Sequence, residues 1–96
     1  MHGQYKIPGG KLVVVDLELD QGRLHQVQVS GDFFIEPDSA LALINQALQG
    51  QPADAGHATF SAAIQAALPA DVQLYGISAD GVAVAVQRAL GLGDAA

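Results

Sequence analysis

The clearest pattern in the sequence is an alternation of apolar and charged positions early in the chain. From Val13 to Leu19 every second residue is apolar, and Asp16, Glu18 and Asp20 occupy alternate positions. A period of two is typical of a β-strand with one buried face. We therefore expect a strand here, with the three carboxylates on its solvated face rather than in a catalytic site.

The strand is followed by signals for an antiparallel return. Residues 20–23 combine an Asp that opens a turn with a Gly that tolerates positive φ, which suits a hairpin with a bulge. Residues 24–29 form the expected return strand. Its apolar phase slips between Leu24 and Val27, as a bulge would cause. A second turn then leads to residues 33–35, which we interpret as the third strand of an antiparallel meander.

Three later segments have the period of amphipathic helices. The first is expected at residues 37–49 and the second at residues 57–68. The third follows Ser78, a favourable N-cap residue, and is closed by Gly91 and Gly93.

The connecting segments carry weaker signals. Residues 1–10 are polar and are expected to form a frayed terminus that turns into the sheet, and residues 51–56 to form a loop. Residues 72–77 fit an extended connector and a fourth edge strand equally well, and residues 94–96 are expected to be disordered. The order of elements predicts an α+β fold, with a three-stranded antiparallel meander followed by about three helices on one face.

The composition limits the functions that such a domain can have. The 96 residues are expected to form a single domain over positions 1–96, ordered from about residue 5 to residue 92. A formal charge of −6 argues against nucleic-acid binding, which requires clustered cations. The chain has no cysteine, no apolar run long enough for a membrane helix and no signal-peptide pattern, so we expect a cytoplasmic location without a membrane partner.

Histidines and serines are the natural candidates for catalysis or metal binding. His2, His25 and His57 have no second ligand at metal-binding spacing, and the simplest interpretation is a surface imidazole at each position. The serines have neither a nucleophile elbow nor a paired base. The sequence therefore predicts no catalytic residue and no metal ligand.

Two short motifs have other possible roles. Gly9, Gly10 and Lys11 resemble a phosphate-binding loop, but they precede a strand, so the helix N-terminus that would hold a phosphate is missing. Phe33 and Phe34 are adjacent, and on a strand they would point to opposite faces. One of them is a plausible docking anchor if it stays exposed, although both could instead be covered by helices.

Three stretches together resemble a known family. They are YKIPGGKLVVVDLELDQGRL, then GDFFIEP leading into an apolar helix, and LYGISADGVAVAVQRAL near the end. The chain resembles the C-terminal accessory domain of lipoate–protein ligases from Tyr5 to about Leu90, in the form found as a separate small subunit in archaeal-type two-component ligases. That family has a small α+β fold with a three-stranded sheet, similar to scaffold proteins of iron–sulfur assembly.

The resemblance implies a non-catalytic role in protein lipoylation. In that family a large catalytic subunit uses ATP and magnesium to convert lipoate into lipoyl-adenylate. It then transfers the lipoyl group to a lysine of an acceptor domain, such as a dehydrogenase E2 subunit or glycine-cleavage H protein. The accessory domain docks beside the active site and supports adenylation. The expected partner is thus the catalytic subunit in a heterodimer, with lipoate, ATP and Mg bound by that subunit and no cofactor bound by this chain.

The resemblance also implies which residues meet the partner. They lie in the two segments that flank the first hairpin: Lys6, Pro8, Gly9, Gly10, Lys11, Gly31, Asp32, Phe33 and Phe34. In an antiparallel meander the start of the first strand and the end of the second lie at the same end of the sheet. The charges of Lys6 and Lys11 could meet a carboxylate of the large subunit or lie near the nucleotide phosphates.

Two other function classes are compatible with a small α+β domain of this kind. An iron–sulfur or sulfur scaffold would need cysteine ligands, and the chain has none. A stand-alone binding or regulatory module of the same fold stays open as the alternative.

Overall fold

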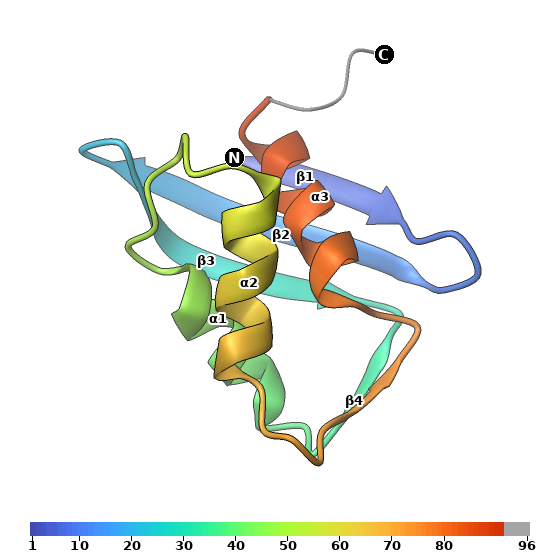
Figure 1. The fold of residues 1–96 in the computed structure, drawn as a ribbon. Helices are drawn as coiled ribbons and strands as arrows, with labels where there is room; N and C mark the ends of the chain where they lie inside the picture. Colours follow the sequence, from blue (N-terminus) through green and yellow to red (C-terminus); the bar gives the residue numbers. More distant parts are fainter. Residues whose placement is uncertain (92–96) are drawn as a thin grey trace.

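The computed structural model describes residues 1–91, and residues 92–96 lie outside the description. The expected α+β fold is confirmed. A three-stranded antiparallel sheet in the order β1-β2-β3 is covered on one face by helices (Figure 1). The elements, in chain order, are β1 (His2–Lys6), β2 (Leu12–Asp20), β3 (Arg23–Gly31), β4 (Phe34–Glu36), α1 (Ala40–Leu48), α2 (His57–Ala67), β5 (Gln73–Tyr75) and α3 (Ala79–Ala89).

The central hairpin agrees with the prediction. β2 and β3 pair antiparallel around a turn at Gln21 and Gly22, both with positive φ. The register shifts between Asp16 and Glu18, and Gln26 on the opposite strand has φ of 52°. The predicted bulge is therefore present where the apolar phase slips. It lets Leu24 and Val27 both point into the core.

The third strand of this sheet was wrongly predicted. It is the N-terminal segment β1, not residues 33–35, and the expected frayed terminus is paired with β2 from His2 onward. β1 has no apolar alternation because one of its inward positions is Gly3. A Cβ there would overlap backbone atoms of Ala85 and Ala89 on α3. The helix can lie close to the strand only because that side chain is absent.

Residues 33–35 contribute instead to a second, two-stranded sheet. β4 pairs antiparallel with β5, with Phe34 opposite Tyr75 and Glu36 opposite Gln73. The segment at 72–77, left open by the sequence, is thus in part a strand. It is not part of the first sheet, in which β1 and β3 pair with the two edges of β2, and the outer edge of β3 is bonded by side chains of the α1 segment.

Two amide side chains accept hydrogen bonds from the outer edge of β3. Asn45 Oδ1 accepts from the Val29 N–H at 3.0 Å, and Gln49 Oε1 accepts from the Val27 N–H at 2.7 Å. Asn45 and Gln49 are four residues apart and so lie on the same side of the helical segment. Their contacts satisfy strand donors that would otherwise stay unpaired.

The helices agree with the prediction within a few residues. α1 begins at Ala40 rather than at residue 37, because residues 37–39 form a tighter turn with bonds between residues three apart. α2 ends at Ala67, just before the residue that precedes Pro69. Ser78 caps α3 as expected, with its Oγ accepting from the Gly81 N–H at 3.0 Å.

The core lies between the sheet and the helices. α1 and α3 contact the sheet, and α2 packs on both of these helices (Figure 1). The centre of the core is formed by fully buried side chains from every layer, including Phe60, Leu24, Ile44, Leu48, Ile64, Val15 and Val86. Asp16, Glu18 and Asp20 are exposed on the opposite, uncovered face of the sheet, as predicted.

Candidate functional site

The structure brings the two predicted docking segments to one end of the molecule. Val13 pairs with Gly31, and the Asp32 N–H donates to the Leu12 carbonyl at 3.2 Å. Gly31 has φ of +149°, and a Cβ at this position would overlap the carbonyl oxygen of Leu12. The strand ends therefore lie side by side, as the meander geometry predicted for these segments.

The β1–β2 turn is held together by its own backbone and by Lys6. The Gly10 N–H donates to the Ile7 carbonyl at 2.8 Å, and Gly9 has φ of +73°. The Lys6 ammonium donates to the carbonyl oxygens of Gly10 at 2.8 Å and Ile7 at 3.3 Å. Pro8 and Gly9 are exposed at the tip. Lys6 thus serves to position the turn, which the sequence did not indicate.

Lys11 connects this turn to the second sheet. Its N–H donates to the carbonyl of Gly76 at 2.9 Å, and its side chain lies against Gly76. The side chain is exposed, and within residues 1–91 its ammonium group makes no hydrogen bond or ion pair. Of the two predicted cations, Lys11 is therefore the one whose charge is not engaged within residues 1–91.

An exposed aromatic pair lies beside Lys11. Phe34 on β4 and Tyr75 on β5 are 56% and 49% exposed, and their ring centroids are 5.7 Å apart with planes tilted by 38°. Phe33 is half-buried and packs against the core. Tyr75 follows directly after Leu74 in a short alternating run, but the sequence could not show that this run pairs with β4.

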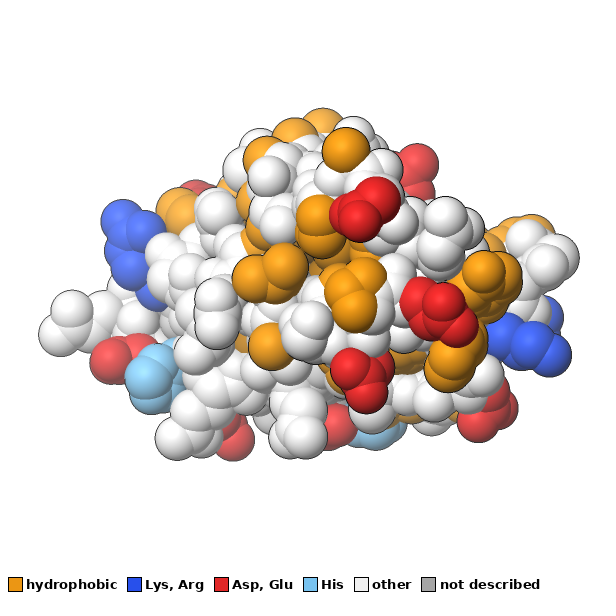
Figure 2. Space-filling view, turned by 90° about the horizontal axis from the view of Figure 1, so that it is seen from below, with side chains coloured by type: hydrophobic (Ala, Val, Ile, Leu, Met, Phe, Trp, Pro, Cys, Tyr) orange, Lys and Arg blue, Asp and Glu red, His pale blue; other side chains and the backbone are white. Residues whose placement is uncertain are grey.

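A shallow groove runs along the other side of Phe34. Its lining consists of Phe33, Phe34, Ile35, Asp38 and Leu41, and its volume is about 160 Å³. Figure 2 shows the molecule from below, where apolar side chains alternate with carboxylates and cations lie toward the edges of the view.

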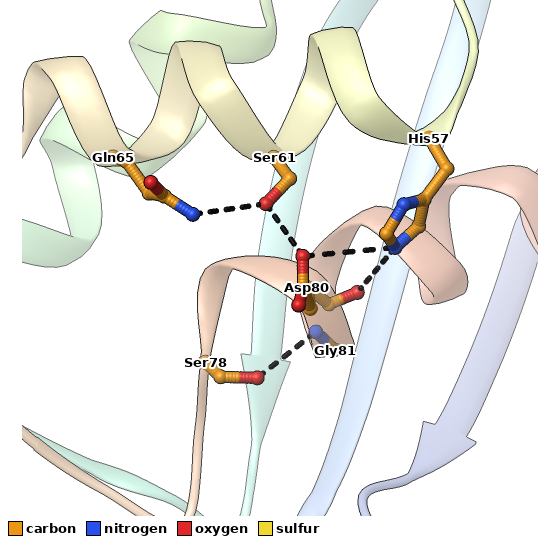
Figure 3. Close-up of polar contacts among 6 residues, drawn as sticks. All are labelled: His57, Ser61, Gln65, Ser78, Asp80 and Gly81. Carbon is orange, nitrogen blue, oxygen red and sulfur yellow. Dashed lines mark hydrogen bonds and ion pairs between the residues drawn. The ribbon is translucent and has the colours of Figure 1, made fainter.

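A polar cluster joins α2 to the start of α3 (Figure 3). Ser61 Oγ donates to Asp80 Oδ1 at 2.7 Å, and Gln65 donates to Ser61 at 3.2 Å. His57 Nε2 lies 3.3 Å from the Asp80 carbonyl oxygen and 3.9 Å from its Oδ1. These residue types resemble a catalytic triad, but the buried Ser61 hydroxyl bonds the carboxylate and not the imidazole. The order of contacts therefore differs from that of a triad, in which the imidazole lies between the hydroxyl and the carboxylate, and the cluster connects α2 to α3.

The other histidines also lie apart from any common site. His2 Nδ1 is 2.8 Å from Asp16 Oδ1, and both side chains are 55% exposed. His25 is exposed on β3. Among residues 1–91, no group of three or more His, Asp or Glu side chains could hold a metal ion. In the same residues no helix has the length and apolar character that crossing a membrane requires.

A second hollow of about 310 Å³ lies between the β1–β2 turn and the start of α3. Its lining consists of Tyr5, Ile7, Pro8, Ser78, Asp80, Gly81 and Val84. Next to this hollow, the Arg88 guanidinium lies 4.7 Å from the centre of the Tyr5 ring and donates to the Gln4 carbonyl at 3.1 Å. The hollow is open and mostly apolar, and it borders the predicted docking turn at Pro8.

Comparisons with known proteins show a likeness of fold to a solved structure. No family model matches the sequence. No curated protein matches it either. The fold is similar to a chain in the structure of an archaeal lipoylation system from Thermoplasma acidophilum, described as a bi-partite lipoate protein ligase and its E2 lipoyl domain. The TM-score is 0.62 at 23% identity, over 90% of this chain and 97% of the other. The likeness shows a shared fold, and it agrees with the fold that the sequence resemblance implied.

Proposed function

We propose that this chain is the accessory subunit of a two-component lipoate–protein ligase. The observation that supports it most is the likeness of fold over nearly the full length of both chains to a component of a lipoylation system. The three sequence stretches quoted above resemble the accessory domain of such ligases. This resemblance does not depend on the comparison of folds. We therefore place this chain on the ligase side of that system rather than with the lipoyl domain.

In this proposal the chain supplies contacts, and the catalytic subunit supplies the chemistry with lipoate, ATP and magnesium. A docked protein promotes a reaction by binding the competent conformation of its partner more tightly than the open one. The contacts would come from Lys11, Phe34 and Tyr75, which lie together at one end of the molecule. Burial of exposed aromatic rings supplies much of the binding energy in many interfaces.

The test is a binding measurement with a lipoate ligase catalytic subunit that lacks this domain, taken from the same genome. Calorimetry should show a one-to-one complex. Phe34→Ala and Tyr75→Ala should each raise the dissociation constant by about tenfold or more, as expected for aromatic anchors. Leu19→Ala is the matched control, because Leu19 is 40% exposed on the β2–β3 hairpin at the other end of the sheet.

Absence of any complex with the wild-type chain would contradict the proposal. A complex that is weakened equally by Leu19→Ala and by Phe34→Ala would contradict the assigned surface. All variants are first compared by thermal unfolding, so that a loss of binding is not caused by a loss of folding.

A further inference from the structure

The groove beside Phe34 combines apolar walls with one carboxylate. Its lining contains Phe33, Phe34 and Leu41, together with the buried Ile35 and the exposed Asp38. An apolar ligand would gain nothing from Asp38, and a small anion would be repelled by it. The lining therefore favours a group that has both an apolar stem and a positive charge.

The Asp38 carboxylate is not used within the domain. Asp38 precedes α1, and its backbone carbonyl accepts from the Leu41 N–H at 3.2 Å. Its side chain makes no hydrogen bond or ion pair within residues 1–91, and neither does that of Glu36 on the neighbouring strand. Both carboxylates are therefore available to a group from outside.

The cations of the chain do not supply the missing charge. Lys6 is bound to the β1–β2 turn, and Arg23 donates to the Gly50 carbonyl at 2.8 Å. Arg88 contacts Gln4 and Tyr5, and Lys11 lies against Gly76. None of the four lines the groove.

We propose that the groove binds an arginine side chain of the docked partner protein. Its aliphatic stem would lie along Phe33 and Leu41, and its guanidinium would contact the Phe34 ring and the Asp38 carboxylate. Arginine fits better than lysine because its planar, weakly hydrated cation both stacks on aromatic rings and pairs with carboxylates. The inference rests on the proposed function, in which the partner is the ligase catalytic subunit.

The test compares charge variants in the binding assay with the catalytic subunit. Asp38→Asn keeps the shape of the side chain and removes its charge, and Asp38→Lys reverses the charge. We expect the dissociation constant to rise about tenfold for Asp38→Asn, and further for Asp38→Lys, because an approaching guanidinium would then be repelled. Asp38→Asn should keep the melting temperature of the wild type, since the carboxylate makes no hydrogen bond or ion pair within residues 1–91. Asp38→Lys should lower it slightly, because it places a cation beside the N-terminus of α1.

The matched control is Asp54→Lys, which changes the net charge by the same amount as Asp38→Lys. Asp54 is exposed in the loop beside the β2–β3 hairpin, where the Ala53 N–H donates to the Gly22 carbonyl. This variant should change the dissociation constant by less than about twofold, because a distant exposed charge is screened by salt.

Alanine substitution of each surface arginine of the catalytic subunit then identifies the occupant. One of these substitutions should weaken binding to the wild-type chain but have little further effect on Asp38→Asn, because the two changes remove the same interaction. A complex that forms with unchanged affinity in both Asp38 variants, or without any coupled arginine, would overturn the inference and leave the proposed function intact. No complex with the wild-type chain would overturn both.

Discussion

The backbone N–H of Lys11 donates to the carbonyl of Gly76 at 2.9 Å, and this bond joins the two sheets of the domain. Lys11 directly precedes β2 of the first sheet, and Gly76 directly follows β5 of the second. The contact fixes the aromatic pair on β4 and β5 relative to the β1–β2 turn. It explains how segments far apart in the sequence form one candidate docking surface.

We expect substitution of Gly76 to weaken the contact between Lys11 and Gly76 that joins the two sheets. Gly76 has φ of +80°, and a Cβ would overlap the side chain of Lys11. Gly76→Ala should lower the free energy of unfolding by about 2 kcal/mol, from backbone strain and steric overlap together. Urea unfolding measures the change. Gly22→Ala separates the two causes, because Gly22 has φ of +77° and open space around it. Equal losses in the two variants would mean that overlap with the Lys11 side chain adds nothing to the backbone strain.

The close approach of β1 and α3 leads to a second prediction. A Cβ at Gly3 would lie 2.6 Å from the Ala85 carbonyl oxygen and would overlap the Ala89 nitrogen. Both are backbone atoms that cannot move alone, so Gly3→Ala should cost about 2–4 kcal/mol of stability. Gln4→Ala, on the exposed face of the same strand, should cost less than about 0.5 kcal/mol. A Gly3→Ala variant as stable as Gln4→Ala would contradict the described packing of helix and strand.

The amide side chains of α1 give a third prediction. Asn45→Ala removes the acceptor of the Val29 N–H, and Val29 is 1% exposed. An unpaired buried donor costs about 1–3 kcal/mol, so this variant should unfold at lower urea concentration and exchange the Val29 amide hydrogen faster. Gln46→Ala on the exposed side of α1 is the control. Unchanged protection of the Val29 amide in Asn45→Ala would show that the hydrogen bond does not hold the strand edge.

Lys11 leads to a fourth prediction, which concerns the function. If its ammonium group meets a carboxylate of the catalytic subunit or the nucleotide phosphates, Lys11→Ala should lower the rate of adenylation by about three- to tenfold, while Lys11→Arg retains most of it. The variant should fold normally, because the ammonium group has no partner within residues 1–91. An unchanged adenylation rate with normal complex formation would remove this role for Lys11.

The sequence predicted the elements whose signals are local. The alternation from Val13 to Leu19, the bulge after Leu24 and the Ser78 cap each depend on neighbouring residues. β1 was missed because Gly3 replaces an apolar side chain at an inward position, so the reason for its pairing lies in α3, far along the chain. Residues 33–35 were recognised as a strand but placed in the wrong sheet. Pairing between β4 and β5 is a tertiary choice that no local pattern encodes.

The candidate site was predictable to a similar extent. That Lys11 and Gly31 lie at the same end of the sheet follows from the meander, and the exposed position of Phe34 was one of two open interpretations. Tyr75 and Asp38 were not found, because Tyr75 reaches this surface through the pairing of β5 with β4 and Asp38 through the turn before α1. The role of Lys6 in binding backbone carbonyls depends on the turn geometry, which the sequence does not specify.

The most direct test of the account is lipoate-dependent exchange between ATP and pyrophosphate. It is measured for the catalytic subunit alone, with an equimolar amount of this chain, and with the Phe34→Ala variant. We predict that exchange requires the wild-type chain and is strongly reduced with the variant, because docking favours the competent conformation. Exchange at the same rate without this chain would contradict the proposed accessory role.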